Sequence, residues 1–441
     1  MAIKKGIPKR HTQAVIVIHG MGEQRPMDTI RGFVDAVLPE PVQGGEKFFS
    51  RPDALSESFE LRVLQNRSQP RTHFFEYYWA YKVSGTTFAH IGSWLSALLL
   101  RSPRRVPKQL RPLWVLSWLL VLAALTGIGL GFFERITQGM SVLISGAAAL
   151  LFGALQSVVL LYIGDVARYL SPAPGNIKLR QDIRADGIRL LKKIQESGDY
   201  DRVIMVGHSL GSVIAYDILK HVWQDCYKDY RQPGKSDQPA LARVEKMGED
   251  LRMGVAGVTL EDYMSAQQDA WKELRGLGCP WLVTDFVTLG SPLTHAALLL
   301  ASDEEDLRLR QRQRELPTNP PVPEVEKTKT GEHRSYSYRV WDPYGPKLNI
   351  HLRALHHAAL FACTRWNNLY FPAAGGFFGD LVGGPMRPWF GSGVRDVPLH
   401  SGNPWIDRTV RAHTSYWDKK AAHTIESLLA ALDLHDTKYY E

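Results

Sequence analysis

One motif constrains the fold of this chain more than any other feature, a GxSxG pattern centred on Ser209. The apolar run Arg202–Val206 leads directly into it, and the helix-like run Ser212–Trp223 leads directly out of it. A strand, a tight turn and a helix in that order expose a serine hydroxyl at the turn. An ordinary turn between a strand and a helix is the alternative interpretation. The pattern predicts Ser209 as a nucleophile, with Gly207 and Gly211 permitting close packing of the helix on the strand.

The rest of the chain alternates between strand-like and helix-like segments. Short apolar runs typical of strands lie at Ala14–Ile18, Phe59–Leu64, His73–Trp79, Arg202–Val206, Trp281–Leu289 and Arg365–Phe371. Helical periodicity lies at Ile177–Gln195, Val213–Val222, 240–275 and Ser415–Leu432. Alternation of this kind predicts an α/β fold, in which helices cover both faces of a mostly parallel sheet.

Two long stretches carry no charged residue, Leu113–Phe133 and Met140–Ile163. As helices they would be roughly 31 and 36 Å long, which is enough to span the hydrocarbon core of a bilayer. Small residues recur every four positions at Ala123, Gly127 and Gly131 in the first stretch and at Ser145, Ala149, Gly153 and Ser157 in the second. Such stripes let two helices approach closely in lipid. The pattern predicts a transmembrane helical hairpin, and two buried core helices are the alternative.

Basic residues flank both ends of this hairpin, at Arg101, Arg104, Arg105, Lys108, Arg111, Arg168, Lys178 and Arg180. Because positive charge concentrates on the cytoplasmic side of a membrane, both ends are expected there, with the turn Glu134–Gly139 outside. The whole chain has 53 Lys+Arg against 45 Asp+Glu, a formal net charge of +8. Since the basic cluster adjoins the hairpin, it favours a bilayer partner over nucleic acid.

Cysteine and histidine patterns exclude several classes of site. Cys226, Cys279 and Cys363 are far apart and form no CxxC pair, which excludes a disulfide scaffold and a cysteine-rich zinc module. No HExxH pattern is present either, so a zinc site is not expected. We therefore expect neither a metal nor another cofactor.

A nucleophilic serine also needs donors for the oxyanion that forms when it attacks a carbonyl. One donor is expected to be the backbone N–H of Leu210, directly after Ser209. The second should come from the loop after an early strand, where His19-Gly20-Met21-Gly22 follows Ala14–Ile18. Glycines such as Gly20 and Gly22 let the backbone turn its N–H toward the substrate, and Met21 is the expected donor.

The base of a serine nucleophile should be a histidine that follows the acid in the chain. Ten histidines follow Ser209. Only His413, in the sequence RAHTSYW, lies in a loop just before the last predicted helix, where the final strand would deliver a base to the elbow. We therefore predict His413 as the base.

The acid should lie in the loop after the preceding strand. Arg365–Phe371 is such a strand, and the glycine-rich loop that follows it contains Asp380. Asp380 is the predicted acid, Asp396 is the alternative, and Asp342 in WDPYG reads as a turn aspartate.

Four segments together resemble the α/β-hydrolase superfamily: HGMG after the first strand, GHSLGSVIAYDIL at the elbow, FVTLGSPL at Phe286–Leu293 and AHTSYW near the end. Within it the chain is most similar to intracellular DDHD-type phospholipase A1 enzymes and related bacterial lipase-like proteins. The resemblance implies an acid in Asp380-Leu381-Val382, where the family has Asp-Pro-Val, and a base that precedes Tyr416-Trp417. It also implies a lipid ester as substrate.

The sequence therefore predicts a membrane-anchored serine hydrolase with an α/β-hydrolase fold. Residues 1–112 form the first part of the hydrolase domain, 113–163 the inserted hairpin and 164–441 the remainder, with 225–278 as a candidate helical cap. The expected protein is an integral membrane protein with its hydrolase domain facing the cytoplasm. A soluble-substrate esterase, thioesterase or acyltransferase is one alternative, and a non-catalytic membrane scaffold with a hydrolase fold is another.

Overall fold

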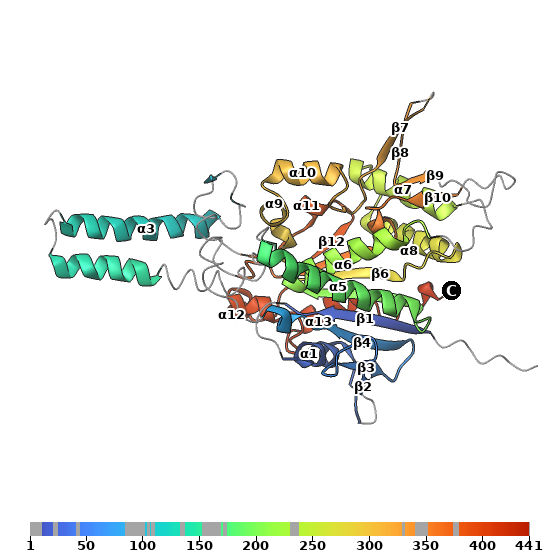
Figure 1. Cartoon of the computed structure of the whole chain (residues 1–441), viewed down its shortest axis with the longest axis horizontal. Helices are drawn as coiled ribbons and strands as arrows, with labels where there is room; N and C mark the ends of the chain where they lie inside the picture. Colours follow the sequence, from blue (N-terminus) through green and yellow to red (C-terminus); the bar gives the residue numbers. More distant parts are fainter. Residues whose placement is uncertain are drawn as a thin grey trace, which may run out of the picture.

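The computed structural model describes most of the chain. The described residues are 11–20, 25–40, 45–83, 102–103, 106, 111–132, 137–151, 169–170, 174–229, 238–328, 331–339, 352–373 and 379–440. They form a sheet covered by helices, and a pair of helices that extends away from it (Figure 1).

An eight-stranded mixed sheet organises the fold. Its strands, in spatial order, are β12 (Val394–Pro398), β11 (Arg365–Tyr370), β6 (Val283–Leu289), β5 (Arg202–His208), β1 (Thr12–Ile18), β4 (Arg71–Tyr77), β3 (Arg62–Asn66) and β2 (Phe48–Pro52). All pairings from β12 to β4 are parallel, whereas β3 is antiparallel to both of its neighbours. Because parallel strands end at the same edge of a sheet, the loops that follow β1, β5 and β11 meet there.

Both faces of the sheet are buried, as the apolar strands predict. In β1, Ala14 and Ile16 belong to one hydrophobic cluster, whereas Val15 and Val17 belong to another. The first cluster includes residues of α5 (Pro174–Glu196), α6 (Leu210–Cys226), α7 (Pro239–Met253) and α8 (Leu260–Gly276). The second includes residues of α1 (Asp28–Val37) and α13 (Ala422–Leu432). The predicted arrangement of helices on both faces of a sheet is therefore confirmed.

The predicted transmembrane hairpin at 113–163 is wrong. Among the helices that the structure describes, none combines the length and the apolar character needed to cross a bilayer. The first stretch forms α3 (Arg111–Phe132), in which Ser117, Thr126 and several glycines lie among the apolar residues. The second helix is described only over 138–151, and 152–163 lie outside the described residues. The predicted integral membrane protein with a cytoplasmic hydrolase domain rested on this hairpin and is corrected with it.

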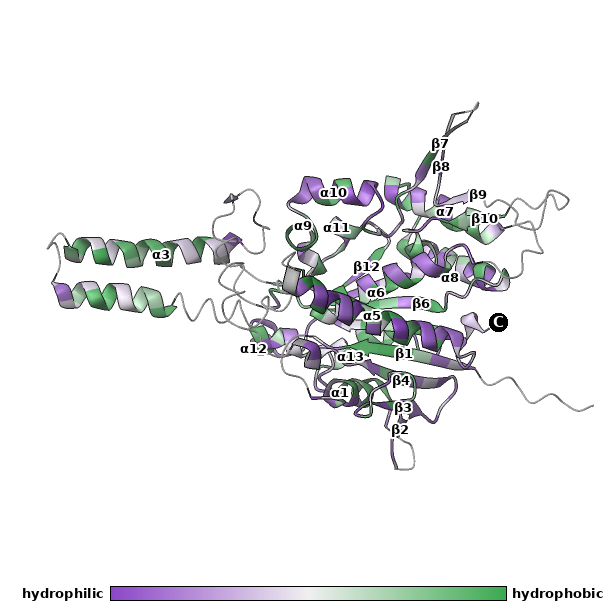
Figure 2. Ribbon diagram, in the orientation of Figure 1, coloured by the Kyte–Doolittle hydropathy of each residue, from purple (hydrophilic) through white to green (hydrophobic). Residues whose placement is uncertain are grey.

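The two extended helices do contact each other through small residues. Ser141 Oγ donates to the carbonyl of Gly127 (2.7 Å), and Ser145 Oγ donates to the carbonyl of Ala124 (3.2 Å). Large apolar side chains point outward, and both helices are mainly hydrophobic in Figure 2. The exposed ones are Val115, Leu119, Leu122, Leu125, Ile128, Leu130, Phe132, Met140, Val142, Leu143, Ile144, Leu150 and Leu151. The predicted contact between small-residue stripes is therefore present at Gly127 and Ser145.

Helices α7 and α8 lie within the candidate cap at 225–278. The amide of Gln267 in α8 donates to the carbonyls of Phe361 (2.6 Å) and Thr364 (3.1 Å), just before β11 begins. Gln268 donates to Asp436 (2.9 Å) near the end of the chain. These contacts are at the amino end of β11, and a role of 225–278 in shaping a substrate site stays a prediction.

The three cysteines, Cys226, Cys279 and Cys363, are free and buried in the first hydrophobic cluster. Burial raises the pKa of each thiol, to about 11 for Cys279 and further for the other two. All three are therefore protonated thiols at neutral pH.

A buried ion pair joins β6 to β11, and its loss should destabilise the sheet. Asp285 is fully buried and accepts a hydrogen bond from Arg365 Nε (2.7 Å). Asp285→Ala should lower the free energy of unfolding by about 3 kcal/mol, because it leaves a buried guanidinium without this partner. Urea unfolding measures the change. Glu57→Ala, which breaks an exposed pair with Lys193, is the control and should leave the midpoint unchanged. Equal midpoints for the two variants would contradict this account.

Candidate active site

Ser209 lies at the turn between β5 and α6, as the motif predicts. Its backbone has φ 51° and ψ −129°, a strained conformation for a residue with a side chain. Two hydrogen bonds hold it there: Ser209 N–H donates to the carbonyl of Leu289 (2.9 Å), and Ser212 Oγ donates to the carbonyl of Ser209 (2.5 Å). The turn therefore places the serine at the end of β5, where the carboxyl-terminal loops of the sheet meet.

Two glycines allow the backbone of this turn to contact the end of β1. A Cβ on Gly211 would lie 2.2 Å from the carbonyl oxygen of Ile18 and 2.5 Å from that of His19. A Cβ on Gly20 would lie 2.8 Å from Ser209 Cβ. Such distances are too short for real atoms, so neither position can hold a larger residue without a backbone shift. Gly20 and Gly211 therefore bring the loop after β1 against the nucleophile.

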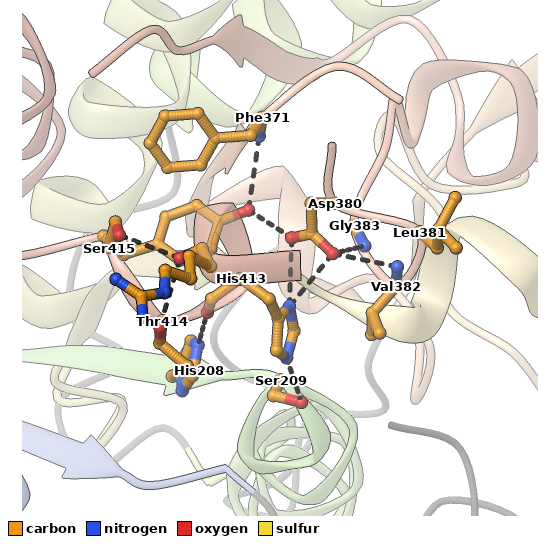
Figure 3. A network of polar contacts seen from close by, with 12 residues as sticks. His208, Ser209, Phe371, Asp380, Leu381, Val382, Gly383, His413, Thr414 and Ser415 are labelled. Atoms are coloured by element: carbon orange, nitrogen blue, oxygen red, sulfur yellow. Dashed lines mark hydrogen bonds and ion pairs between the residues drawn. The ribbon is translucent and has the colours of Figure 1, made fainter. Parts of the chain in front are cut away.

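His413, the predicted base, lies within the short helix η6 (Val410–Thr414), which follows β12 along the chain. Its Nε2 lies 2.9 Å from Ser209 Oγ, and its Nδ1 lies 3.0 Å from each carboxylate oxygen of Asp380 (Figure 3). Ser209, His413 and Asp380 are all buried, with 1%, 5% and 0% of their surface exposed. Because water is largely excluded, the hydrogen bonds between them are stronger than they would be at the surface.

Asp380 is held ionised by the groups around it. Its Oδ1 accepts from the backbone N–H groups of Val382 (2.8 Å) and Gly383 (3.0 Å), and its Oδ2 accepts from the Tyr416 hydroxyl (2.7 Å). Burial alone would raise the pKa of this carboxyl, but the charge and hydrogen bond of His413, together with the Tyr416 and Gly383 donors, lower it to about 2. Asp380 is therefore a carboxylate at neutral pH.

Asp396, the alternative acid, has a different partner set. Its carboxylate accepts from the backbone N–H groups of Met386 (2.9 Å) and Arg387 (3.0 Å) and from the amide of Asn368 (2.7 Å). These contacts tie β12 to β11 and to the start of the short helix α11 (Arg387–Phe390). Asp380 therefore contacts His413, the predicted base, whereas Asp396 contacts other groups.

The ring of His208, beside Ser209, contacts the backbone of His413. His208 Nε2 lies 2.9 Å from the carbonyl oxygen of His413, and the His208 ring packs edge-on against Trp417 at 5.0 Å. Burial, and then the nearby His413, lower the pKa of His208 to about 3. The ring is therefore neutral, and Nε2–H donates to the carbonyl. Neither His208 nor Trp417 has a role that its local motif predicts, although both lie in the same motifs as predicted site residues.

Of the two expected oxyanion donors, the structure describes Leu210, which directly follows Ser209. Leu210 is the first residue of α6, where backbone N–H groups have no acceptor within the helix. Met21 and Gly22 lie outside the described residues. The start of their loop is ordered by Trp79, whose ring stacks on His19 at 5.1 Å and whose indole N–H donates to the His19 carbonyl (3.1 Å).

The tautomer of His19 follows from its contacts. The backbone N–H of Trp79 donates to His19 Nε2 (3.3 Å). His19 Nδ1 therefore carries the proton and donates to the carbonyl of Gly20 (2.8 Å). Burial lowers the pKa of His19 to about 4 and keeps the ring neutral. His19 therefore holds the backbone of Gly20 in place beside Ser209.

Chemically, the assembled side chains can activate a hydroxyl. Asp380 accepts the Nδ1 proton of His413, which leaves the Nε2 lone pair facing Ser209 Oγ and able to take its proton. Within the described ranges, no group of three or more His, Cys, Asp or Glu residues is arranged to hold a metal ion.

Comparison with models of protein families, with curated proteins and with solved structures finds no match to this chain. What the protein does must therefore be inferred from the geometry around Ser209 and from its motifs.

The contact between Gly211 and β1 can be tested by its effect on stability. Gly211→Ala should lower the free energy of unfolding by about 1–3 kcal/mol, because its Cβ would meet backbone atoms of Ile18 and His19 that cannot move alone. Gly276→Ala, in α8, is the matched control: nothing lies within 4 Å of the added carbon, so its stability should be equal or higher. Thermal or urea unfolding of both variants gives the comparison. A Gly211→Ala protein as stable as Gly276→Ala would contradict the close approach.

Proposed function

We propose that this protein is a serine hydrolase that cleaves carboxylic esters through Ser209, His413 and Asp380. One observation carries the proposal: Ser209 Oγ, the His413 ring and the Asp380 carboxylate form a continuous hydrogen-bonded chain, with separations of 2.9 and 3.0 Å. The three residues are contributed by distant parts of the sequence, and each lies in a loop at the carboxyl edge of the sheet. Such an arrangement has a clear chemical use and no evident structural one.

The proposed reaction has two halves. In the first, His413 Nε2 takes the Ser209 proton as Oγ attacks the ester carbonyl, and the resulting oxyanion is held by the N–H of Leu210 and, as expected from the sequence, that of Met21. The protonated His413 then donates its proton to the departing alkoxide, which leaves as an alcohol. In the second half, His413 takes a proton from water as the water oxygen attacks the acyl-serine carbonyl. The bond from the acyl carbon to Ser209 Oγ then breaks, His413 returns its proton to Oγ, and the carboxylic acid leaves.

Asp380 would act without changing its protonation state. Its carboxylate holds the Nδ1 proton and stabilises the imidazolium that forms in each half of the reaction. Because the pKa of Asp380 is lowered to about 2, this carboxylate stays ionised throughout the neutral and mildly acidic range.

The proposed substrate is a lipid acyl ester, and the motif resemblance to DDHD-type phospholipase A1 enzymes is the reason for that choice. The same triad would also serve an esterase, a thioesterase or an acyltransferase on a soluble substrate. Assays with phospholipids, short-chain esters and acyl thioesters, each with and without an acceptor alcohol, separate these activities. A non-catalytic scaffold is less well supported, because it has no need for a strained serine at φ 51° beside a buried base.

The nucleophile can be identified by covalent labelling. A fluorophosphonate probe should label the wild-type protein and fail to label Ser209→Ala, because only a serine activated by a base attacks the phosphorus at a useful rate. Gel fluorescence and mass spectrometry of the labelled peptide provide the measurement. Ser197→Ala, which removes a hydroxyl at the end of α5, is the control and should label normally. Persistent labelling of Ser209→Ala would assign the nucleophile elsewhere.

The base and acid can be tested by their effects on turnover. His413→Ala should reduce kcat by about as much as Ser209→Ala, on the order of 10⁴-fold or more, because the triad acts as a unit. Asp380→Asn should cost less than either. Asp396→Asn, with circular dichroism as a check on folding, is the control, since Asp396 only ties β12 to β11 and α11. Normal turnover by Asp380→Asn together with an inactive, folded Asp396→Asn would reverse the assignment of the acid.

A further inference from the structure

Tyr416 contacts the buried carboxylate and has no role in the mechanism above. It follows η6, three residues after His413, and its side chain is fully buried. Its hydroxyl donates to Asp380 Oδ2 (2.7 Å) and accepts from the backbone N–H of Phe371 (3.2 Å), at the end of β11. The Tyr416 hydroxyl therefore joins the backbone at the end of β11 to the Asp380 carboxylate.

The direction of the tyrosine proton is fixed by these two partners. A phenol has one proton, and the Phe371 N–H occupies one of its acceptor positions, so the proton is directed at Asp380 Oδ2. Burial, and then the charge of Asp380, raise the pKa of Tyr416 well above its ordinary value. The hydroxyl therefore remains a donor at neutral and mildly acidic pH.

The two oxygens of Asp380 are supported unequally. Oδ1 accepts from two backbone N–H groups, those of Val382 and Gly383. Apart from His413, the hydrogen-bond donor that the structure describes for Oδ2 is Tyr416. Because His413 Nδ1 lies 3.0 Å from both oxygens, removal of the tyrosine hydroxyl would leave more negative charge on the carboxylate that His413 contacts.

We propose that Tyr416 is a positioning residue that acts through Asp380, fixing the carboxylate against His413 and limiting how strongly it favours the protonated imidazole. The inference rests on the proposed function, because Tyr416 would adjust how readily His413 accepts a proton in the proposed triad. In this arrangement Tyr416 keeps more of the base unprotonated, and so able to accept a proton, at mildly acidic pH.

Other titratable groups packed against this pair do not produce the same effect. His208, at the end of β5, faces His413 but has its pKa lowered to about 3 by burial. His295, in η4 (Pro292–His295), contacts the carbonyl of Leu381 (3.0 Å), and burial also lowers its pKa. These neutral rings therefore add no positive charge beside Asp380 and His413.

The test is the pH dependence of Tyr416→Phe. With p-nitrophenyl butyrate as substrate, the acid limb of kcat/KM should move to higher pH by about half to one unit. The reason is that Asp380, with one hydrogen-bond donor fewer, carries more negative charge and stabilises the His413 imidazolium more strongly. At high pH, kcat should fall by less than about tenfold, since the triad itself is intact. Tyr263→Phe is the matched control: it removes a buried tyrosine hydroxyl that donates to the carbonyl of Phe361 (3.2 Å), and its acid limb should not move.

A second readout does not require turnover. In ¹⁵N-histidine-labelled protein, the ring resonances of His413, identified by their absence in His413→Ala, give its titration midpoint directly. This midpoint should rise in Tyr416→Phe and stay at the wild-type value in Tyr263→Phe. A folded Tyr416→Phe with an unmoved midpoint would overturn the inference, as would an equal shift in both variants. A shift in a protein that neither turns over nor reacts with fluorophosphonate would instead reject the proposed function and leave the coupling between Tyr416 and His413 standing.

If Tyr416→Phe does not fold, the hydroxyl can be altered without being removed. Incorporation of 3-fluorotyrosine at position 416 gives a stronger donor of nearly the same size, so the His413 midpoint should move to lower pH. A midpoint that is unchanged, or that moves to higher pH, would reject the proposal.

Discussion

The backbone contact between α6 and the end of β1 is the constraint on which the rest of the site depends. Gly211 lies so close to the carbonyl oxygens of Ile18 and His19 that no Cβ fits between them. This contact joins segments almost two hundred residues apart in the sequence, because β1 and β5 are adjacent in the sheet. It sets the position of Ser209 relative to the loop after β1, and the strained turn is maintained by the packing around it.

A second constraint is electrostatic. One full negative charge, on Asp380, is buried beneath the site, and four donors surround it: two backbone N–H groups, the Tyr416 hydroxyl and His413 Nδ1. The nearby rings of His19 and His208 are kept neutral by burial, so no permanent positive charge competes for this carboxylate. Full satisfaction of its lone pairs is what makes a buried charge tolerable here.

The sequence was informative wherever the signal was local. The motif around Ser209 needed only its neighbouring strand and helix, and the positions of Asp380 and His413 followed from the order of strands and loops. Contacts between distant side chains carry no such local pattern, which is why His208 and Tyr416 were not assigned roles. The edge strand β12 was also missed, since its half-exposed residues lack an apolar run. Helix α13 begins at Ala422 rather than Ser415, because turns occupy residues 415–421 between η6 and the helix. The hairpin prediction is contradicted by the described helices, none of which is both long and apolar enough to cross a membrane.

The burial of all three cysteines has a practical consequence for chemical labelling. Alkylating reagents react with thiolates, and Cys226, Cys279 and Cys363 are protonated and inaccessible in the folded protein. A single cysteine introduced at an exposed position, such as Phe59 or Trp405, would therefore carry a fluorophore or spin label selectively in the otherwise native sequence. Alkylation of the native thiols would in turn report loss of the folded core, so the same reagent can both label the surface and monitor unfolding.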